Sequence, residues 1–275
     1  MSAQSIKTTP QFMGDDSSGR FFTVTFSCME KPKARIVFIP PFGEEMNRCR
    51  SLVAQQARSF ATQGYACTLL DFLGTGDSQG ELCDATLANW RENIRFTLEK
   101  IALEEDVPLI LWGLRMGALI ALDYAAKFRP AVRDIILWQP VTNGKMFVTQ
   151  VLRQRVASLM VRELPAETTK EIRQKLEEGE KVEVAGYTLG GPLMGDFERI
   201  DLAQLTDLCS GSIHWLEHVI EPGKEPGIPA QKAIVQLREQ GNTVVLKTFS
   251  DPQIWQIHER DFAPQLLALS DGLLP

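Results

Sequence analysis

The sequence lacks the features that mark membrane, secreted and zinc-bound proteins. None of its apolar stretches approaches the roughly twenty residues that a bilayer span needs, and its N-terminus has no basic start followed by an apolar core, as a secretory signal has. The five cysteines are scattered, odd in number and never in Cys-x-x-Cys spacing, which argues against a disulfide framework and a zinc site. We therefore expect a cytoplasmic protein with reduced thiols and no membrane span.

Clustered positive charge is also missing. The formal net charge is −6 and no block is rich in lysine or arginine, which argues against nucleic acid or an anionic membrane as the main partner. The glycine-punctuated loop 71–78 (DFLGTGDS) lacks the lysine and the spacing of a phosphate-binding P-loop. We expect Asp77 and Ser78 to bond backbone groups within this loop, and we expect no cofactor.

What the sequence does contain is an alternation of apolar strands and amphipathic helices. The chain is predicted to open with a hairpin. Further strands are predicted at 34–39, 65–72, 108–112, 133–138, 212–219 and 243–249, and helices at 46–60, 84–103, 118–128, 229–240 and 259–274. Asp84 is the predicted N-cap of its helix. This rhythm predicts an α/β fold with a mostly parallel, doubly wound sheet and helices on both faces.

The alternation breaks between about Gly144 and Leu205. Here we expect two helices, 145–161 and 165–178, followed by an irregular stretch that contains residues 182–189. Ligand sites in open α/β sheets lie at the carboxyl edge, so an insertion at this point would form a lid. A plain helical subdomain and an oligomer contact are the alternatives. The predicted division is a core of residues 1–143 and 206–275 with a helical lid at 144–205.

The organising stretch is 108–128, an apolar strand and an alanine-rich helix joined by Gly113-Leu114-Arg115-Met116-Gly117. Glycines two positions on either side of a central residue are typical of a nucleophile elbow, a strained turn that lifts one side chain above the sheet. A simple tight connection between strand and helix is the alternative. The central residue is Arg115, whose guanidinium stays protonated and cannot attack a carbonyl.

Taken together, these motifs resemble the α/β-hydrolase superfamily. Residues 40–47 resemble its oxyanion loop, 71–78 its Asp-x-x-Gly-x-Gly-x-Ser loop and 112–117 its elbow. The resemblance is closer to one branch, the exosortase A system-associated hydrolases of type 2, found with bacterial exopolysaccharide and exosortase systems. The segments that carry it are PPFGEEMNRCR, LLDFLGTGDSQGE, LWGLRMGAL, LWQPVTNGK and VEVAGYTL. Arginine at the centre of the elbow is part of that resemblance.

The resemblance implies positions for a hydrolase site. The oxyanion donors would be the backbone N–H groups of Met116 and of Phe42 or Gly43. The acid would follow a strand, where Glu217, Glu221 or Gln139 stands. The histidine is expected near residues 250–253, which contain none, and His258 lies several residues further on. His214 and His218 are expected to be structural. A Ser-His-acid mechanism is therefore not supported.

Arg115 suggests another use of the same turn. At a helix N-terminus, its planar fork and the free backbone N–H groups favour a bound carboxylate, phosphate or sugar acid. The competing interpretation is an internal ion pair with Glu44, Glu45 or Asp71, since a buried arginine needs a partner.

Two further functions stay open from the sequence. One is a hydrolase or transferase acting on an acyl, ester or saccharide-linked substrate, with Glu44, Glu45 or His258 as the base that activates water. The other is a non-catalytic accessory that docks within polysaccharide or export machinery. We accordingly expect a small anionic, acyl or saccharide ligand.

Overall fold

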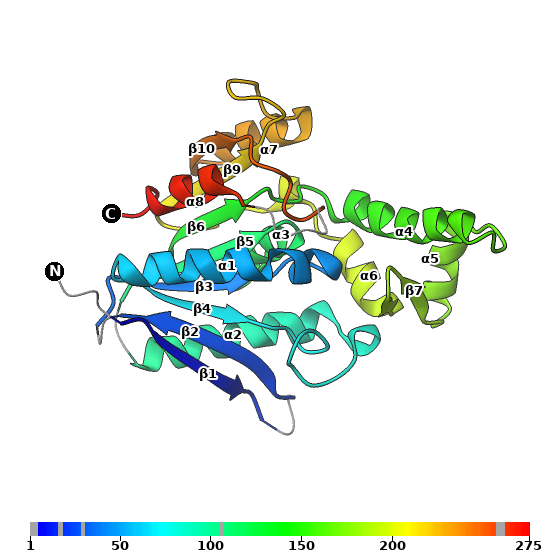
Figure 1. Cartoon of the computed structure of the whole chain (residues 1–275), viewed down its shortest axis with the longest axis horizontal. Helices are drawn as coiled ribbons and strands as arrows, with labels where there is room; N and C mark the ends of the chain where they lie inside the picture. The colour runs from blue at the N-terminus through cyan, green and yellow to red at the C-terminus, as the bar shows by residue number, and fades with distance from the viewer. Residues whose placement is uncertain (1–4, 16–18, 29–30, 105–106, 257–261) are drawn as a thin grey trace.

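The computed structural model describes the chain apart from residues 1–4, 16–18, 29–30, 105–106 and 257–261 (Figure 1). The strands are β1 (Lys7–Met13), β2 (Phe21–Ser27), β3 (Arg35–Ile39), β4 (Ala66–Leu70), β5 (Leu109–Leu114), β6 (Val132–Trp138), β7 (Val182–Val184), β8 (Tyr187–Leu189), β9 (Ser212–His218) and β10 (Thr243–Phe249). The α-helices are α1 (Glu44–Thr62), α2 (Leu87–Glu104), α3 (Met116–Phe128), α4 (Gly144–Val161), α5 (Thr169–Glu177), α6 (Gly191–Glu198), α7 (Ile228–Glu239) and α8 (Pro264–Asp271). Two 3₁₀ turns, Leu82–Asp84 and Leu202–Gln204, complete the described elements.

The main sheet has eight strands in the order β1-β2-β4-β3-β5-β6-β9-β10. The hairpin of β1 and β2 pairs antiparallel, and β2 is also antiparallel to β4. All the remaining pairs of this sheet are parallel. The predicted mostly parallel sheet is therefore confirmed, and the carboxyl ends of β3, β5, β6, β9 and β10 share one edge, where such sheets bind ligands.

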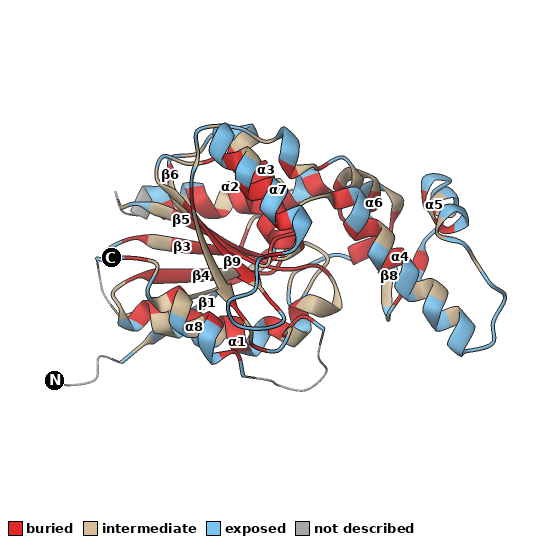
Figure 2. Cartoon of the chain, turned by 90° about the horizontal axis from the view of Figure 1, so that it is seen from above, coloured by how far each residue is buried: buried red, intermediate tan, exposed pale blue. Residues whose placement is uncertain are grey.

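Helices cover both faces of the sheet (Figure 2). Helices α1 and α8 lie on one face, and α2, α3 and α7 lie on the other. The apolar residues of the two faces form separate clusters, one under α1 and α8 and a larger one that continues beneath the inserted helices. Because central strands such as β5 are buried on both sides, their sequences are continuously apolar rather than alternating.

The core strands and the helices α1, α3 and α7 match their predicted positions to within a few residues, whereas the predicted starts of α2 and α8 are wrong. Helix α8 begins at Pro264, after the non-helical residues 262–263, and residues 259–261 of the predicted closing helix lie outside the described residues. Asp84 ends a 3₁₀ turn and pairs with Lys181 at 2.9 Å. The N-terminal cap comes from Thr86, whose Oγ1 accepts a hydrogen bond from the N–H of Asn89 at 3.1 Å. Both residue types favour caps, so local propensity alone did not separate them.

The inserted region is more ordered than the sequence suggested. The stretch 182–189 forms the antiparallel hairpin β7-β8, and helix α6 follows it, which the sequence analysis missed. Together with α4 and α5, these elements stand beyond the carboxyl edge, on the right of Figure 1. The two ends of the inserted region lie next to each other. The N–H of Gly144, at its start, donates to the carbonyl of Ile200, near its end, at 2.8 Å. The lid boundaries of 144 and 205 stay a prediction.

No helix in the described part of the chain combines the length and the apolarity that a membrane crossing demands.

Candidate functional site

The turn after β5 has the geometry of the predicted elbow. Arg115 stands between β5 and α3 with φ 55° and ψ −120°, a strained backbone that costs roughly 1–3 kcal/mol. Its N–H donates to the carbonyl of Trp138 at 3.0 Å, and its carbonyl accepts from the N–H groups of Ala118 and Val141 at 3.1 and 3.2 Å. Strand β6, helix α3 and the loop after β6 thus hold the strained residue in place at the carboxyl edge.

The two flanking glycines are required by close backbone approach. A Cβ on Gly117 would lie 2.3 Å from the carbonyl oxygens of Ile39 and Pro40, and one on Gly113 would lie 2.4 Å from the Cα of Ala118. Such contacts are far shorter than normal packing permits, so any side chain would force the helix away from the strand. This steric requirement explains the Gly-x-x-x-Gly spacing.

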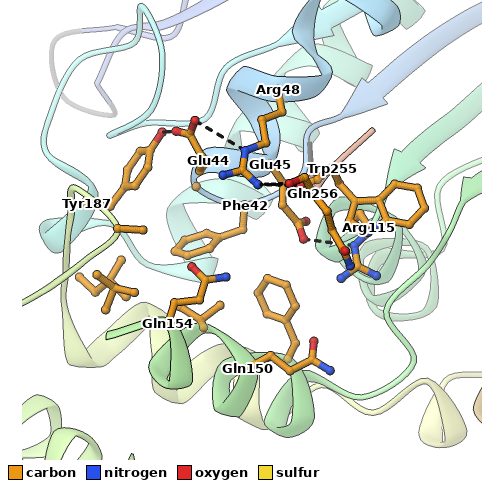
Figure 3. Close-up of a pocket in the computed structure, with 16 residues that line it drawn as sticks. Phe42, Glu44, Glu45, Arg48, Arg115, Gln150, Gln154, Tyr187, Trp255 and Gln256 are labelled. Atoms are coloured by element: carbon orange, nitrogen blue, oxygen red, sulfur yellow. Dashed lines mark hydrogen bonds and ion pairs between the residues drawn. The ribbon is translucent and has the colours of Figure 1, made fainter. Parts of the chain in front are cut away.

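The Arg115 side chain lies at the floor of a cavity and touches two partners (Figure 3). Its Nε donates to Glu45 Oε1 at 3.2 Å. Its guanidinium carbon lies 5.3 Å from the centroid of the Trp255 ring, within the range of a cation–π contact. Among the residues that the structure describes, no other group accepts a hydrogen bond from this guanidinium. Both Nη groups therefore stay available to a ligand.

Glu45 is only half satisfied by this contact. Its Oε2 is buried and has no hydrogen-bond partner in the described part of the chain. Burial raises the pKa of the Glu45 carboxyl, and the opposing charge and hydrogen bond of Arg115, with the charge of Arg48, do not offset it fully. A neighbouring arginine alone suggests a lowered pKa, but here desolvation is the larger effect.

The other two predicted partners of Arg115 are engaged elsewhere. Glu44 Oε2 accepts a hydrogen bond from the hydroxyl of Tyr187 in β8 at 2.9 Å, which joins the start of α1 to the lid. Asp71 accepts from Arg50 with both carboxylate oxygens at 2.9 Å. The structure thus selects Glu45 from the three alternatives, and the loop 71–78 has the structural role expected for it. Asp71 rather than Asp77 is the carboxylate that accepts a backbone N–H there, that of Asp77 at 3.0 Å.

Of the predicted oxyanion residues, Phe42 and Gly43 line the same cavity, and Met116 directly follows Arg115 in the chain. Gly43, with φ 61°, is the N-cap of α1, and Met116 is the first residue of α3. The leading N–H groups of a helix have no intrahelical acceptor, so both helix starts offer donors near Arg115. The Phe42 ring packs edge-on against Phe147 of α4, with centroids 6.1 Å apart. The role of these residues in binding an anion stays a prediction.

The positions expected for an acid and a histidine are occupied by a closed network. Glu217 in β9 accepts hydrogen bonds from Gln139 Nε2 at 3.0 Å and from Trp215 Nε1 at 2.8 Å. His218 Nδ1 is bonded to Gln253 at 3.2 Å, and burial lowers the pKa of this imidazole. Glu221 is exposed, 3.9 Å from Lys224. His258 lies outside the described residues.

The cavity has a volume of about 400 Å³, within the range of small-molecule sites. The sequence predicted the lining residues from the elbow and the start of α1, but not those contributed by α4, β8 and the loop after β10. The missed residues are Gln150 and Gln154 of α4, Tyr187 of β8, and Trp255 and Gln256 of the loop after β10. Trp255 follows the last strand, in the region where the resemblance predicts a histidine, and this position is the one sequence signal for its place at the site. Arg48 holds this loop through Nη1, which donates to the carbonyls of Trp255 and Gln256 at 3.3 and 3.0 Å.

Comparison with known proteins identifies the family and supports the fold. A family model described as serine aminopeptidase, S33 (Hydrolase_4), matches residues 30–213. The chain belongs to this family of α/β-hydrolases. The match begins before β3 and ends in β9, so it includes the elbow and the inserted elements from α4 to α6.

Individual relatives of the family are more distant. The mitochondrial palmitoyl-protein thioesterase ABHD10 of Mus musculus is 31% identical over 142 residues, 52% of this chain and 42% of the mouse protein. Its Homo sapiens counterpart is 29% identical over 140 residues, 51% of this chain and 40% of the human protein. The chain thus spans less than half the length of these curated relatives.

Solved structures share the fold. Alpha/beta hydrolase domain-containing protein 10 from mouse superposes with a TM-score of 0.59 at 16% identity, covering 96% of this chain and 97% of the mouse chain. Est1E from Butyrivibrio proteoclasticus superposes with a TM-score of 0.64 at 15% identity, covering 95% of this chain and 96% of its own.

Proposed function

We propose that this chain binds an anionic group of a small ligand at Arg115, and that it has lost the serine mechanism associated with its fold. One observation carries the proposal. The residue lifted above the sheet by the elbow is an arginine, with both Nη groups available, at the floor of a cavity. A guanidinium cannot form an acyl intermediate, but it binds carboxylate and phosphate through two parallel hydrogen bonds.

We further propose that the protein works within bacterial exopolysaccharide or exosortase systems. The support is the resemblance of its oxyanion-loop, elbow and lid segments to the type 2 hydrolases associated with exosortase A. A cytoplasmic location is part of this proposal, and the free thiols of all five cysteines are consistent with a reducing compartment.

A titration with acetate and with inorganic phosphate tests the anion site. The indole N–H resonance of Trp255, in contact with Arg115, serves as the reporter. We expect saturable shifts that weaken at least tenfold in Arg115→Gln, because the variant lacks the charged fork. Arg95→Gln is the matched control, since Arg95 pairs with Glu92 and Glu99 on the outer side of α2. Binding that is absent from the wild type, or that survives in Arg115→Gln, would contradict the proposal.

The loss of the serine mechanism has its own test. A fluorophosphonate probe, which reacts with activated serines, is expected to leave the protein unlabelled. Stoichiometric labelling of any serine would overturn this part of the proposal while leaving the anion site to the titration.

A second candidate function is hydrolysis by directly activated water. The observation that favours it is Glu45, a carboxyl with a raised pKa and one unpartnered oxygen beside Arg115. A carboxylate base needs these properties, and Arg115 would stabilise the developing oxyanion. Esterase and thioesterase assays on p-nitrophenyl acetate and an acyl-coenzyme A decide between the candidates. Activity that rises with pH and is abolished in Glu45→Gln would support hydrolysis, and a flat background across both substrates supports a binding protein.

A non-catalytic docking role is the remaining alternative from the sequence. Capture of a defined export component that is indifferent to Arg115→Gln would favour it over both functions above.

A further inference from the structure

The lid helix α4 presents an unusual face to the cavity. Phe147, Gln150, Val151 and Gln154 recur at the spacing that brings residues onto one side of a helix, and all four line the cavity. Phe147 and Val151 are buried, while Gln150 and Gln154 are exposed. In Figure 3 the Gln154 side chain reaches from α4 into the cavity, and the Gln150 side chain lies alongside the helix at the cavity's border. The face that covers the site therefore alternates apolar groups with amides.

These amides have no partners of their own. Within the described ranges, neither the side chain of Gln150, nor that of Gln154, nor that of Gln256 opposite them forms a hydrogen bond with the protein. Each amide carries donors and an acceptor, which matches the hydroxyl group, itself a donor and an acceptor. An acyl chain offers neither, and it would strip water from the amides without replacing it. The cavity is thus poorly suited to a long alkyl chain, such as the palmitoyl group in the names of the ABHD10 relatives.

The floor of the cavity adds a charge and an aromatic surface. Arg115 provides the anion receptor, and Trp255 places a ring beside it at 5.3 Å. Ring faces carry negative potential, which attracts the polarised C–H groups of a hydroxylated carbon skeleton. A volume of about 400 Å³ limits the ligand to a small molecule.

We propose that the cavity takes a sugar acid, a carboxylate-bearing polyol whose carboxylate binds Arg115 and whose hydroxyls bind Gln150 and Gln154. This inference rests on the anion-binding function proposed above and names its ligand class. The carboxylate engages the Nη edge of the guanidinium, because Glu45 already occupies Nε. The hydroxyls then face the lid, so that lid contacts select the sugar while the elbow selects the charge.

Calorimetric titration of the full chain with four probes tests the inference: D-glucuronate, D-glucose, acetate and octanoate. Glucuronate is expected to bind at least tenfold more tightly than acetate, because only glucuronate adds hydrogen bonds to the amides. Glucose, which lacks the charge, and octanoate, which lacks the hydroxyls, are both expected to bind more weakly than glucuronate.

The double variant Gln150→Leu/Gln154→Leu separates the two parts of the site. Leucine keeps the approximate size and the helix propensity, so the lid should still fold. We expect glucuronate affinity to fall roughly 30-fold while acetate affinity is unchanged. Gln174→Leu is the control, since Gln174 lies on α5 and bonds Glu178 rather than lining the cavity.

The outcomes distinguish the inference from the function beneath it. If acetate binds through Arg115 but glucuronate gains nothing over it, or if octanoate binds best, the ligand class is wrong and the anion site stands. If no probe carrying a carboxylate binds in an Arg115-dependent way, both proposals fail.

Discussion

Two arginine–carboxylate pairs of similar exposure serve different ends in this molecule. Arg91 of α2 and Asp123 of α3 expose 16% and 12% of their side chains, and Arg115 and Glu45 expose 15% and 20%. The first pair is bidentate, with Nε and Nη2 each donating at 2.8 Å to a different oxygen. The second has one contact, at 3.2 Å, and leaves Glu45 Oε2 without a partner in the described part of the chain. The bidentate pair joins two helices and uses both carboxylate oxygens. The single-contact pair leaves the two Nη groups of Arg115 without an acceptor among the described residues, and a ligand can use them.

The largest expected difference between the pairs is in stability. Asp123→Asn should lower the free energy of unfolding by about 3 kcal/mol, because it leaves the Arg91 charge uncompensated between two helices. Glu45→Gln should cost less than about 1 kcal/mol, because burial already disfavours the charged form of Glu45 and raises its pKa, so a neutral amide that still accepts from Arg115 avoids that cost. Urea unfolding of the two variants measures both values. Equal losses would show that the elbow pair is as structural as the helix pair.

The next effect is on ligand binding, with the order of the pairs reversed. Arg115→Gln should weaken acetate binding at least tenfold, since it removes the charged fork whose two Nη groups have no acceptor among the described residues. Asp123→Asn, assayed at a temperature where it stays folded, should leave the affinity unchanged. The same Trp255 resonance reports on both variants, and a loss of binding in Asp123→Asn would mean that the two regions are coupled.

A smaller effect concerns the contact that closes the cavity. The Tyr187 hydroxyl donates to Glu44 at 2.9 Å and accepts from Asn47 Nδ2 at 2.7 Å, and burial first, then the bond to Glu44, raises its pKa to about 12. Tyr187→Phe removes both hydrogen bonds and should lower the free energy of local opening by about 1 kcal/mol. Amide hydrogen exchange in β7 and β8 should therefore accelerate about fivefold. Tyr124→Phe, on α3 away from the lid, is the control. Unchanged exchange in Tyr187→Phe would show that packing alone holds the hairpin.

The smallest effect is a pH dependence. The native pKa of Glu45 is raised above its unfolded value of about 4.5, so above that pH the native state holds more protons than the unfolded state. Stability contributed by this group is therefore lost as pH rises through 4.5 toward the native pKa. Glu45→Gln should flatten the fall in unfolding free energy over that interval, and unfolding at a series of pH values measures the slope. Identical slopes for the wild type and Glu45→Gln would mean that burial does not raise the pKa of Glu45.

The sequence predicted much of this arrangement, and the misses have physical causes. The elbow followed from Gly113 and Gly117, whose roles depend on local backbone sterics. The choice of Glu45 over Glu44 as partner did not, because adjacent helical residues point in different directions and only the lid, through Tyr187, engages Glu44. Gln150 and Trp255 come from a lid and a loop far apart in the chain, and no local pattern joins them.

The hairpin β7-β8 was missed for a related reason. Its strands have only three residues each, which is too short for a periodic signal. Tertiary packing fixes it instead, since Val182 and Val184 are buried against the lid helices.

A crystal structure after soaking in sodium acetate tests the central claim most directly. We expect a carboxylate in the cavity with its oxygens about 2.8 Å from the two Nη atoms of Arg115, while Glu45 keeps its hydrogen bond from Nε. An Arg115 fork turned onto both oxygens of Glu45, with no acetate beside it at saturating concentration, would contradict it.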